Sequence, residues 1–328
     1  MKAILPVAIL ASLGFALSAR AQVDFIIVEK MNDNIQTNTG TVTLRPFIPN
    51  DPNTLPPLSS PYRLQFHVEG ETNLSTLTPM SFTVPSGSSF IANPSADYNL
   101  YYNSESNNWG RTFQFQNKYS PTGGPPSGTG PGGLDGVFNN GAFSINVGGT
   151  TVNVNLGGVA NADVYPSTPV ASVSAGTWAV TNPILYLDVN EALTITTSTF
   201  ANYTTNGYLN HIGLYIFMKD GDELAELESF SDNTNFPGKS TDDFLSYTIN
   251  SGTLISGKTY VVEMEFNTAT SQSSEYSGAF GAALFTSRTH FAIQAVPEPS
   301  TYAAIIGLVS LAGAAAMRRR SAGSLPRK

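Results

Sequence analysis

Short runs of alternating apolar and polar residues, separated by Gly, Pro and Asn, constrain the fold of this chain more than any other feature of its sequence. Residues 63–69 are the clearest case. Because successive strand side chains point to opposite faces, one face of this segment receives Leu64, Phe66 and Val68. The other face receives Gln65, His67 and Glu69. The alternation predicts a strand that is buried on one face and solvated on the other.

Further apolar segments predict strands along most of the chain. They are residues 25–28, 41–44, 142–147, 150–156, 184–189, 212–218, 260–266 and 289–295. In 260–266 the polar positions Glu263 and Glu265 again predict a half-buried strand. Asn140-Gly141 and Gly148-Gly149 predict two-residue turns in a meander of short strands that begins at Val137-Phe138. Asp220-Gly221 predicts a hairpin into a further strand, although an amphipathic helix also fits the spacing after it.

These segments together predict an all-β fold, a sandwich or jelly roll of short antiparallel strands. The Pro- and Gly-rich tract 120–133 has no apolar residue to anchor it, which predicts a flexible loop. Neither half of the chain shows a clear terminus of its own. We therefore expect one β-rich exported domain over residues 22–296, interrupted by that loop.

The first 21 residues have the order of a secretory signal peptide. Lys2 precedes an apolar segment at 3–17, and the small residues of 18–21 favour cleavage after Ala21 by signal peptidase. A cleavable N-terminal helix and an export route are therefore expected. The sequence contains no cysteine, so the exported body has neither a disulfide nor a lipid anchor at its start.

The charge of the body separates it from nucleic-acid-binding proteins. Residues 22–299 contain nine basic and 24 acidic residues, a net charge of −15. Such a body repels phosphate backbones and anionic headgroups, which argues against nucleic acid as a partner and against peripheral membrane binding.

The C-terminal end combines three physically distinct parts. Pro297 and Pro299 exclude regular helix or strand and leave Glu298 on an accessible stem. The uncharged run 302–317 predicts a transmembrane helix that reaches roughly 24 Å, short of the ~30 Å hydrocarbon core. A basic cluster at 318–320 follows and would hold that end at the cytoplasmic face.

This order resembles the PEP-CTERM sorting signal of Gram-negative bacteria, in which a Pro-Glu-Pro motif, a hydrophobic helix and a basic cluster are recognised by an exosortase. The motif residues are Pro297, Glu298 and Pro299, and the stop-transfer residues are Arg318, Arg319 and Arg320. The basic tail 321–328 departs from the family's pattern. The resemblance implies a transient C-terminal membrane anchor, cleavage near the motif and delivery of the body to the cell surface or the extracellular space. An ordinary single-pass tail anchor is the alternative.

Aromatic residues gather in one stretch of the body. They are Tyr98, Tyr101, Tyr102 and Trp109, with several Asn residues between them. Flat rings beside amide groups are typical of a platform that binds sugar rings, as in a carbohydrate-binding module. The alternative is that these rings pack in a loop or in the core.

Metal and nucleotide sites are weakly indicated. Carboxylates that could supply hard oxygen ligands for Ca²⁺ are Asp220, Asp222, Asp242 and Asp243, but no complete calcium loop is present. His67 and Glu69 share a strand face and would form a metal site only if His211 or His290 came near, so a solvated strand face is favoured. The glycines of 128–133 match a dinucleotide fingerprint only formally, because Pro131 and its surroundings supply neither strand nor helix.

No catalytic motif is found, and no acid–base pair can be selected among the 24 carboxylates. The sequence favours a non-enzymatic exported protein with a structural or adhesive role at the cell surface or in extracellular matrix such as a biofilm. The alternative is a carbohydrate-binding β-sandwich that acts on exopolysaccharide. A jelly-roll glycoside hydrolase is the third possibility.

Overall fold

Three long strands run through the centre of the molecule, which we describe from a computed structural model. They are β1 (Phe25–Asn38), β16 (Thr259–Ser273) and β17 (Phe280–Val296). The structure describes residues 23–46, 60–70, 74–92, 97–104, 106–118, 133–180, 182–205, 207–219, 222–232 and 238–297. The expected signal peptide 1–21, loop residues 120–132, the expected helix 302–317 and the tail 321–328 lie outside these residues.

The long strands belong to an eleven-stranded mixed sheet in the order β14-β13-β16-β17-β1-β3-β6-β5. Its other strands are β3 (Tyr62–Glu69), β5 (Tyr101–Asn103), β6 (Asn108–Phe115), β13 (Leu209–Met218) and β14 (Glu223–Phe230). Off this path, β2 (Thr41–Leu44) pairs with β1, and β10 (Thr177–Trp178) pairs with β11 (Ile184–Asp188), which pairs with β17. The described residues are thus mostly β, as predicted.

Strand length and direction differ from the prediction of short antiparallel strands. β1 and β11 both run parallel to β17, whereas β16 runs antiparallel to it. A parallel pair requires a long connection between its strands, and β1 and β17 lie near opposite ends of the chain. Pairing between such distant segments cannot be predicted from the local sequence pattern.

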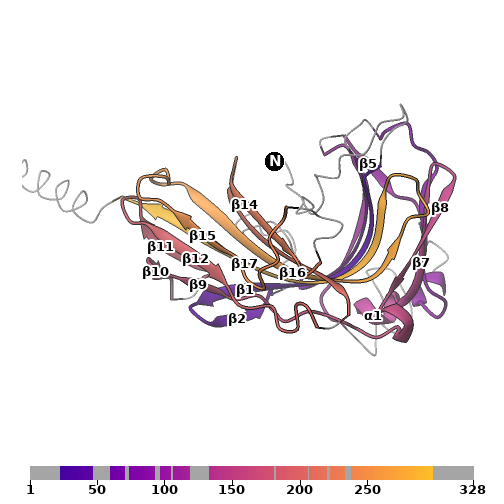
Figure 1. Cartoon of the computed structure of the whole chain (residues 1–328), viewed down its shortest axis with the longest axis horizontal. Coiled ribbons are helices and arrows are strands. Elements are labelled where there is room, and N and C mark those ends of the chain that lie inside the picture. Colours follow the sequence, from indigo (N-terminus) through magenta and orange to yellow (C-terminus); the bar gives the residue numbers. More distant parts are fainter. Residues whose placement is uncertain are drawn as a thin grey trace, which may run out of the picture.

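Two three-stranded sheets pack at different positions on one face of the large sheet (Figure 1). The first contains β4 (Met80–Thr83), β7 (Gly141–Val147) and β8 (Thr150–Leu156). The second contains β9 (Ala171–Val173), β12 (Leu193–Thr197) and β15 (Ser246–Ile249). In Figure 1 the first sheet lies at the right of the molecule and the second at the left. Packing of sheet on sheet is what a sandwich requires, while jelly-roll topology stays a prediction.

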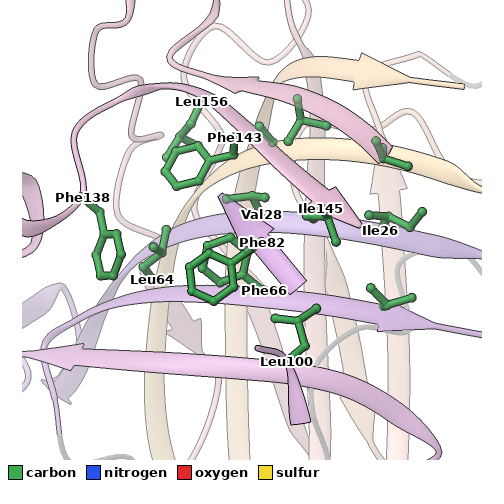
Figure 2. Packing of buried hydrophobic residues seen from close by; sticks show 14 of the residues in the cluster. Ile26, Val28, Leu64, Phe66, Phe82, Leu100, Phe138, Phe143, Ile145 and Leu156 are labelled. Atoms are coloured by element: carbon green, nitrogen blue, oxygen red, sulfur yellow. The ribbon is translucent and has the colours of Figure 1, made fainter. Parts of the chain in front are cut away.

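Each small sheet encloses a hydrophobic core against the large sheet. Figure 2 shows the first core, in which Ile26, Leu64 and Phe66 of the large sheet face Phe82 and Phe143 of the small one. The rings of Phe66 and Phe82 stack with centroids 4.2 Å apart, an arrangement that adds to the burial of apolar area.

Strand β17 contributes the same face to both cores. Ala283 and Phe285 belong to the first core, while Phe291, Ile293 and Ala295 belong to the second. A boundary between two domains would have to cut this strand. The prediction of one domain over residues 22–296 stays a prediction, and the shared strand favours it.

Short helices complete the described residues. They are η1 (Ser89–Ala92), α1 (Leu134–Val137) and η2 (Gly158–Ala160). Helix α1 corrects the predicted meander, because Val137 ends a helical turn and Gly141 begins β7 instead of closing a hairpin. Leu134 and Val137 are three residues apart and are both buried in the first core. This spacing places them on one face of a helical turn, whereas in a strand they would point to opposite faces.

One turn prediction and one strand prediction are confirmed. Gly148 and Gly149 have positive φ angles of 56° and 94° and join β7 to β8, as expected of a Gly-Gly turn. Residues after 221 form strand β14 and not an amphipathic helix, and β14 pairs antiparallel with β13. Residues 220–221 themselves lie outside the described residues.

Candidate functional site

The face of the large sheet opposite the two cores, here called the polar face, carries a network of buried charged and polar side chains. Strand register places on it Glu29, Asp33, Arg63, Gln65, His67, His211, Glu228, Glu263, Glu265, Asn267, Thr286, Arg288 and His290. The predicted solvated face of residues 63–69 is therefore wrong, since Gln65 and His67 are buried and Glu69 is half-buried. Glu263 and Glu265 are buried too, so β16 is not half-buried there.

Arg288 lies at the centre of this network on β17. Its Nη2 donates to Glu265 Oε2 at 2.8 Å, and its Nε lies 3.2 Å from Glu263 Oε1. Both carboxylates come from neighbouring β16 and face one guanidinium that is 1% exposed. A buried charge is tolerated only when it is paired and hydrogen-bonded, so the three side chains stabilise one another.

A second ion pair joins β1 to β3. Arg63 Nη2 donates to Asp33 Oδ1 at 2.8 Å, and Arg63 Nε lies 2.7 Å from Asp33 Oδ2. His290 lies between this pair and Glu263, with Nε2 3.4 Å from Asp33 Oδ1 and Nδ1 3.3 Å from Glu263 Oε2. Burial alone would raise the pKa of Asp33, but the Arg63 guanidinium and the contact with His290 hold it well below its usual range.

A row of hydrogen bonds crosses the same face from β1 to β13. Thr286 Oγ1 contacts both Glu29 Oε1 and Asn267 Oδ1, while Asn267 Nδ2 contacts Glu265 Oε1 at 3.0 Å and His211 Nδ1 at 2.9 Å. One hydroxyl proton cannot serve two acceptors. A proton on Glu29 satisfies both contacts, which agrees with burial raising the pKa of Glu29 to about 7.

Burial moves the pKa of acids and histidines on this face in opposite directions. It raises the pKa of Glu69 and Glu263 to about 7 and lowers the pKa of His67 and His290 to about 3. His67 Nδ1 lies 3.7 Å from Glu69 Oε1, as their shared strand face predicts. Among the described residues, no group of three or more His, Cys, Asp or Glu has the arrangement of a metal site.

The calcium candidates lie apart from this network. Asp222 is an exposed residue directly before β14, and Asp220 lies outside the described residues. Asp242 and Asp243 are exposed in the segment before β15. Asp242 Oδ2 accepts a hydrogen bond from Ser240 Oγ at 2.8 Å, which is ordinary turn chemistry. Calcium binding by these residues stays a prediction.

The four predicted aromatic residues lie on or beside β5 and β6 at one edge of the large sheet. Tyr102 and Trp109 pack together with ring centroids 5.5 Å apart and planes tilted by 51°. Trp109 Nε1 donates to the Leu74 carbonyl at 2.8 Å. Tyr98 instead packs edge-on against Phe90 of the first core. Tyr101, by contrast, is 55% exposed, with the Arg111 guanidinium 5.3 Å from its ring centroid and its hydroxyl donating to Asp97 Oδ2.

Strand β17 leads directly into the predicted sorting stem. Val296 pairs with Asp188 of β11, and its carbonyl accepts a hydrogen bond from Val189 at 3.1 Å. Pro297 follows at once and, having no backbone N–H, ends the ladder. Glu298, Pro299 and the cluster Arg318, Arg319 and Arg320 lie outside the described residues. Within the part of the chain that is described, no helix is long and apolar enough to cross a membrane.

Comparison with protein families matches residues 295–320 to the PEP-CTERM protein-sorting motif. The chain carries a PEP-CTERM sorting motif. The motif begins at the last buried residue of β17, Ala295, and implies an exported, cell-surface-sorted protein that is processed by an exosortase.

Other comparisons add little to the PEP-CTERM assignment. No curated protein matches the sequence. Among solved structures, the native conformation of E. coli alpha-2-macroglobulin matches 70% of this chain at 12% sequence identity and a TM-score of 0.21. The chain spans 13% of that protein, and a similarity at this level carries no argument about fold or function.

The buried polar network is the part of the site that sequence reasoning missed. Alternation places its residues on one face of each strand, but not opposite one another. All three histidines of the sequence lie in it, within strands β3, β13 and β17. The available signal was a histidine or arginine within a predicted strand, together with acidic residues in other predicted strands.

Proposed function

We propose that this PEP-CTERM protein has a structural or adhesive role at the surface of a Gram-negative bacterium or in its extracellular matrix, without enzymatic activity. Signal peptidase and an exosortase are its processing partners. Its body reaches the surface after a transient stage in which the C-terminal segment 302–317 anchors it in the membrane. The observation that carries the proposal is the direct continuity of central strand β17 with the sorting motif.

That continuity determines how force on the tail would enter the body. β17 is bordered by β16 on one side and by β1 and β11 on the other. A pull on Val296 acts along the strand, so hydrogen bonds of three neighbouring strands resist it together. A protein that holds cells or matrix together benefits from such a connection.

The sorting step is tested by changing the motif in the full chain. Replacement of Pro297, Glu298 and Pro299 by Ala should leave an uncleaved form in the membrane fraction. Loss of cell-surface delivery is expected with it, measured by fractionation and immunoblotting. As a matched control, Pro183→Ala changes a proline of the body and should leave processing unchanged. Normal processing of the triple variant would contradict the role of these residues.

The structural role is tested separately from sorting. Deletion of the gene should reduce cohesion of the surface layer or matrix, measured as shear needed to detach cells. The wild-type chain should restore it, and the triple motif variant should not. Unchanged cohesion after deletion would contradict a structural role while leaving sorting intact.

A carbohydrate-binding role is the second candidate, and the exposed ring of Tyr101 on β5 favours it. Exopolysaccharide would be the ligand. On a glycan array, Tyr101→Ala should lose specific binding that the wild-type protein shows, because the exposed ring against which a sugar would pack is removed without opening the core. Tyr186→Ala is the matched control, since Tyr186 is 43% exposed on β11. Absence of any glycan signal would exclude this candidate, and release of sugars from a polysaccharide panel would instead indicate a glycoside hydrolase.

A further inference from the structure

Lys30 is a fully buried lysine on the core-facing side of β1. Its side chain is 0% exposed, and its strand neighbours in register are Leu64 of β3 and Phe285 of β17, both in the first core. Burial of an ammonium group among apolar side chains is unfavourable unless its neighbours compensate for lost water.

Two side chains from the segment before β7 contact Lys30. Nζ donates to Asp135 Oδ1 at 2.8 Å and to Asn140 Oδ1 at 2.7 Å. Since a carbonyl bond is about 1.2 Å long, the Asn140 Cγ lies at most about 4 Å from Nζ, near the range of a reactive contact. A nucleophile, an acyl carbon and a carboxylate thus meet at one partly buried site.

The orientation of the Asn140 amide is set by its other neighbour. Asn140 Nδ2 donates to Asp163 Oδ1 at 2.6 Å, and Asp163 is in turn paired with Lys118. A flipped amide would turn its NH₂ group to the Lys30 ammonium and its oxygen to the Asp163 carboxylate, and both contacts would be repulsive. The carbonyl therefore faces Lys30, and the amide nitrogen faces the side where Asp163 is 27% exposed.

The surroundings also favour an uncharged amine at Lys30. Burial lowers its pKa from the ordinary value, although the Asp135 carboxylate opposes this effect. A neutral amine is the nucleophilic form, and a lysine with a lowered pKa is a common covalent nucleophile.

We propose that Lys30 and Asn140 form an intramolecular amide bond between Nζ and Cγ, with release of ammonia. The reaction uses only atoms already in contact and needs no enzyme, oxidant or cofactor. It joins strand β1 of the large sheet to the residue directly before β7 of the small sheet.

The reaction moves two protons away from the lysine nitrogen. Nζ transfers one proton to Asp135 Oδ1, and its lone pair then forms a bond to Asn140 Cγ. The Cγ–Nδ2 bond breaks with its electron pair on nitrogen, which takes a second proton from Nζ and leaves as ammonia. The lysine nitrogen ends as a neutral amide with one hydrogen, and Asp135 ends protonated. Asp163 holds the departing nitrogen on the more exposed side of the site.

Asn140 is preferred over Asp135 as the acyl partner for two reasons. An amide carbonyl accepts a nucleophile more readily than an anionic carboxylate, because a carboxylate resists further negative charge. Asp135 also fits the other role, since proton transfer needs a carboxylate at hydrogen-bond distance from the nucleophile. The competing product, an amide between Lys30 and Asp135, would release water instead of ammonia.

Mass spectrometry of the purified full chain tests the proposal. After proteolysis, the peptides that contain Lys30 and Asn140 should appear as one branched peptide, lighter than their sum by one ammonia. Fragmentation should locate the branch at these residues. Separate peptides with unmodified Lys30 and Asn140 would overturn the proposal, and so would a branch to Asp135 with loss of one water.

Variants test the assigned roles. Lys30→Arg and Asn140→Ala should abolish the branched peptide, and Asp135→Asn should reduce its yield at least tenfold at equal incubation time. Lys258→Met, which changes an exposed lysine, is the control and should leave full yield. If Asp135→Asn links as completely as the wild type, the proton-transfer role is wrong. If a variant fails to fold, the branched peptide of the wild-type chain still decides whether the bond exists.

Discussion

The two faces of the large sheet are built from the same strands and are stabilised in different ways. One face packs apolar side chains such as Phe66, Phe266 and Ile293 against the small sheets. The other face buries Arg288, Glu265 and their neighbours in ion pairs and hydrogen bonds. Apolar packing is non-directional and tolerates small changes, whereas a buried charge network depends on every partner being present. One face of the sheet should therefore tolerate conservative substitutions, whereas the other should be destabilised by the loss of a single charged partner.

Removal of Arg288 from the polar face should lower the stability of the protein most. Arg288→Met leaves Glu263 and Glu265 buried without their partner, and the free energy of unfolding should fall by about 3–5 kcal/mol at neutral pH. Urea denaturation measures the change. Lys258→Met removes an exposed charge and should change stability by less than about 0.5 kcal/mol. An equally small change for Arg288→Met would mean that the network contributes little.

The pH dependence of stability should come from the polar face. Glu29, Glu69 and Glu263 have pKa values raised by burial to about 7 from 4.5. Between these values the folded chain keeps protons that the unfolded chain has released. Stability therefore falls as the pH rises through this window, by about 1.4 kcal/mol per pH unit for each group.

His67 and His290 have the opposite effect on the pH dependence of stability. Burial lowers their pKa values from 6.5 to about 3, so between these values only the unfolded chain binds the protons and stability rises with pH. The two effects partly cancel below pH 6.5, and the steepest fall is expected from pH 6.5 to about 7. Glu29→Gln should make the fall shallower, measured by urea denaturation at several pH values. An unchanged profile would show that Glu29 does not keep a proton in the folded chain.

A conservative substitution on the apolar face should change the free energy of unfolding least. Ile212→Val removes one methylene group from the second core and should lower stability by about 1 kcal/mol. The loss should be equal at every pH, because no titrating group is touched. A loss that varied with pH as Glu29→Gln does would contradict the separation of the two faces.

Local sequence predicts the apolar face better than the polar one. The alternation at 63–69 correctly gives the core-facing set Leu64, Phe66 and Val68, because side-chain period follows from strand geometry alone. It gives no indication that His67 is buried on the opposite face. Burial of that face depends on which strands become neighbours, and those neighbours lie far apart in the sequence.

The candidate sites also differ in how far the sequence predicts them. The sorting motif is contiguous, so its order of Pro-Glu-Pro, apolar run and arginines is complete in the sequence. Lys30, Asp135 and Asn140 come from two distant segments, and only the packing of α1 and β7 beside β1 brings them together. The aromatic stretch is an intermediate case. Tyr102 and Trp109 do meet, but Tyr98 packs against Phe90 instead.

The parallel pairing of β1 with β17 also constrains the order of events during export. Phe25, at the N-terminal end of β1, pairs with Phe280, which lies 15 residues before Ala295, where the sorting motif begins. A chain that crosses the membrane from its N-terminus delivers β1 first and β17 last, so the central pair of the sheet cannot form until nearly all of the body has emerged. Contacts between such distant segments form slowly, and an unpaired β1 is exposed to association with other chains in the meantime. A temporary hold by the C-terminal segment would keep each chain apart from its neighbours while β17 completes the sheet.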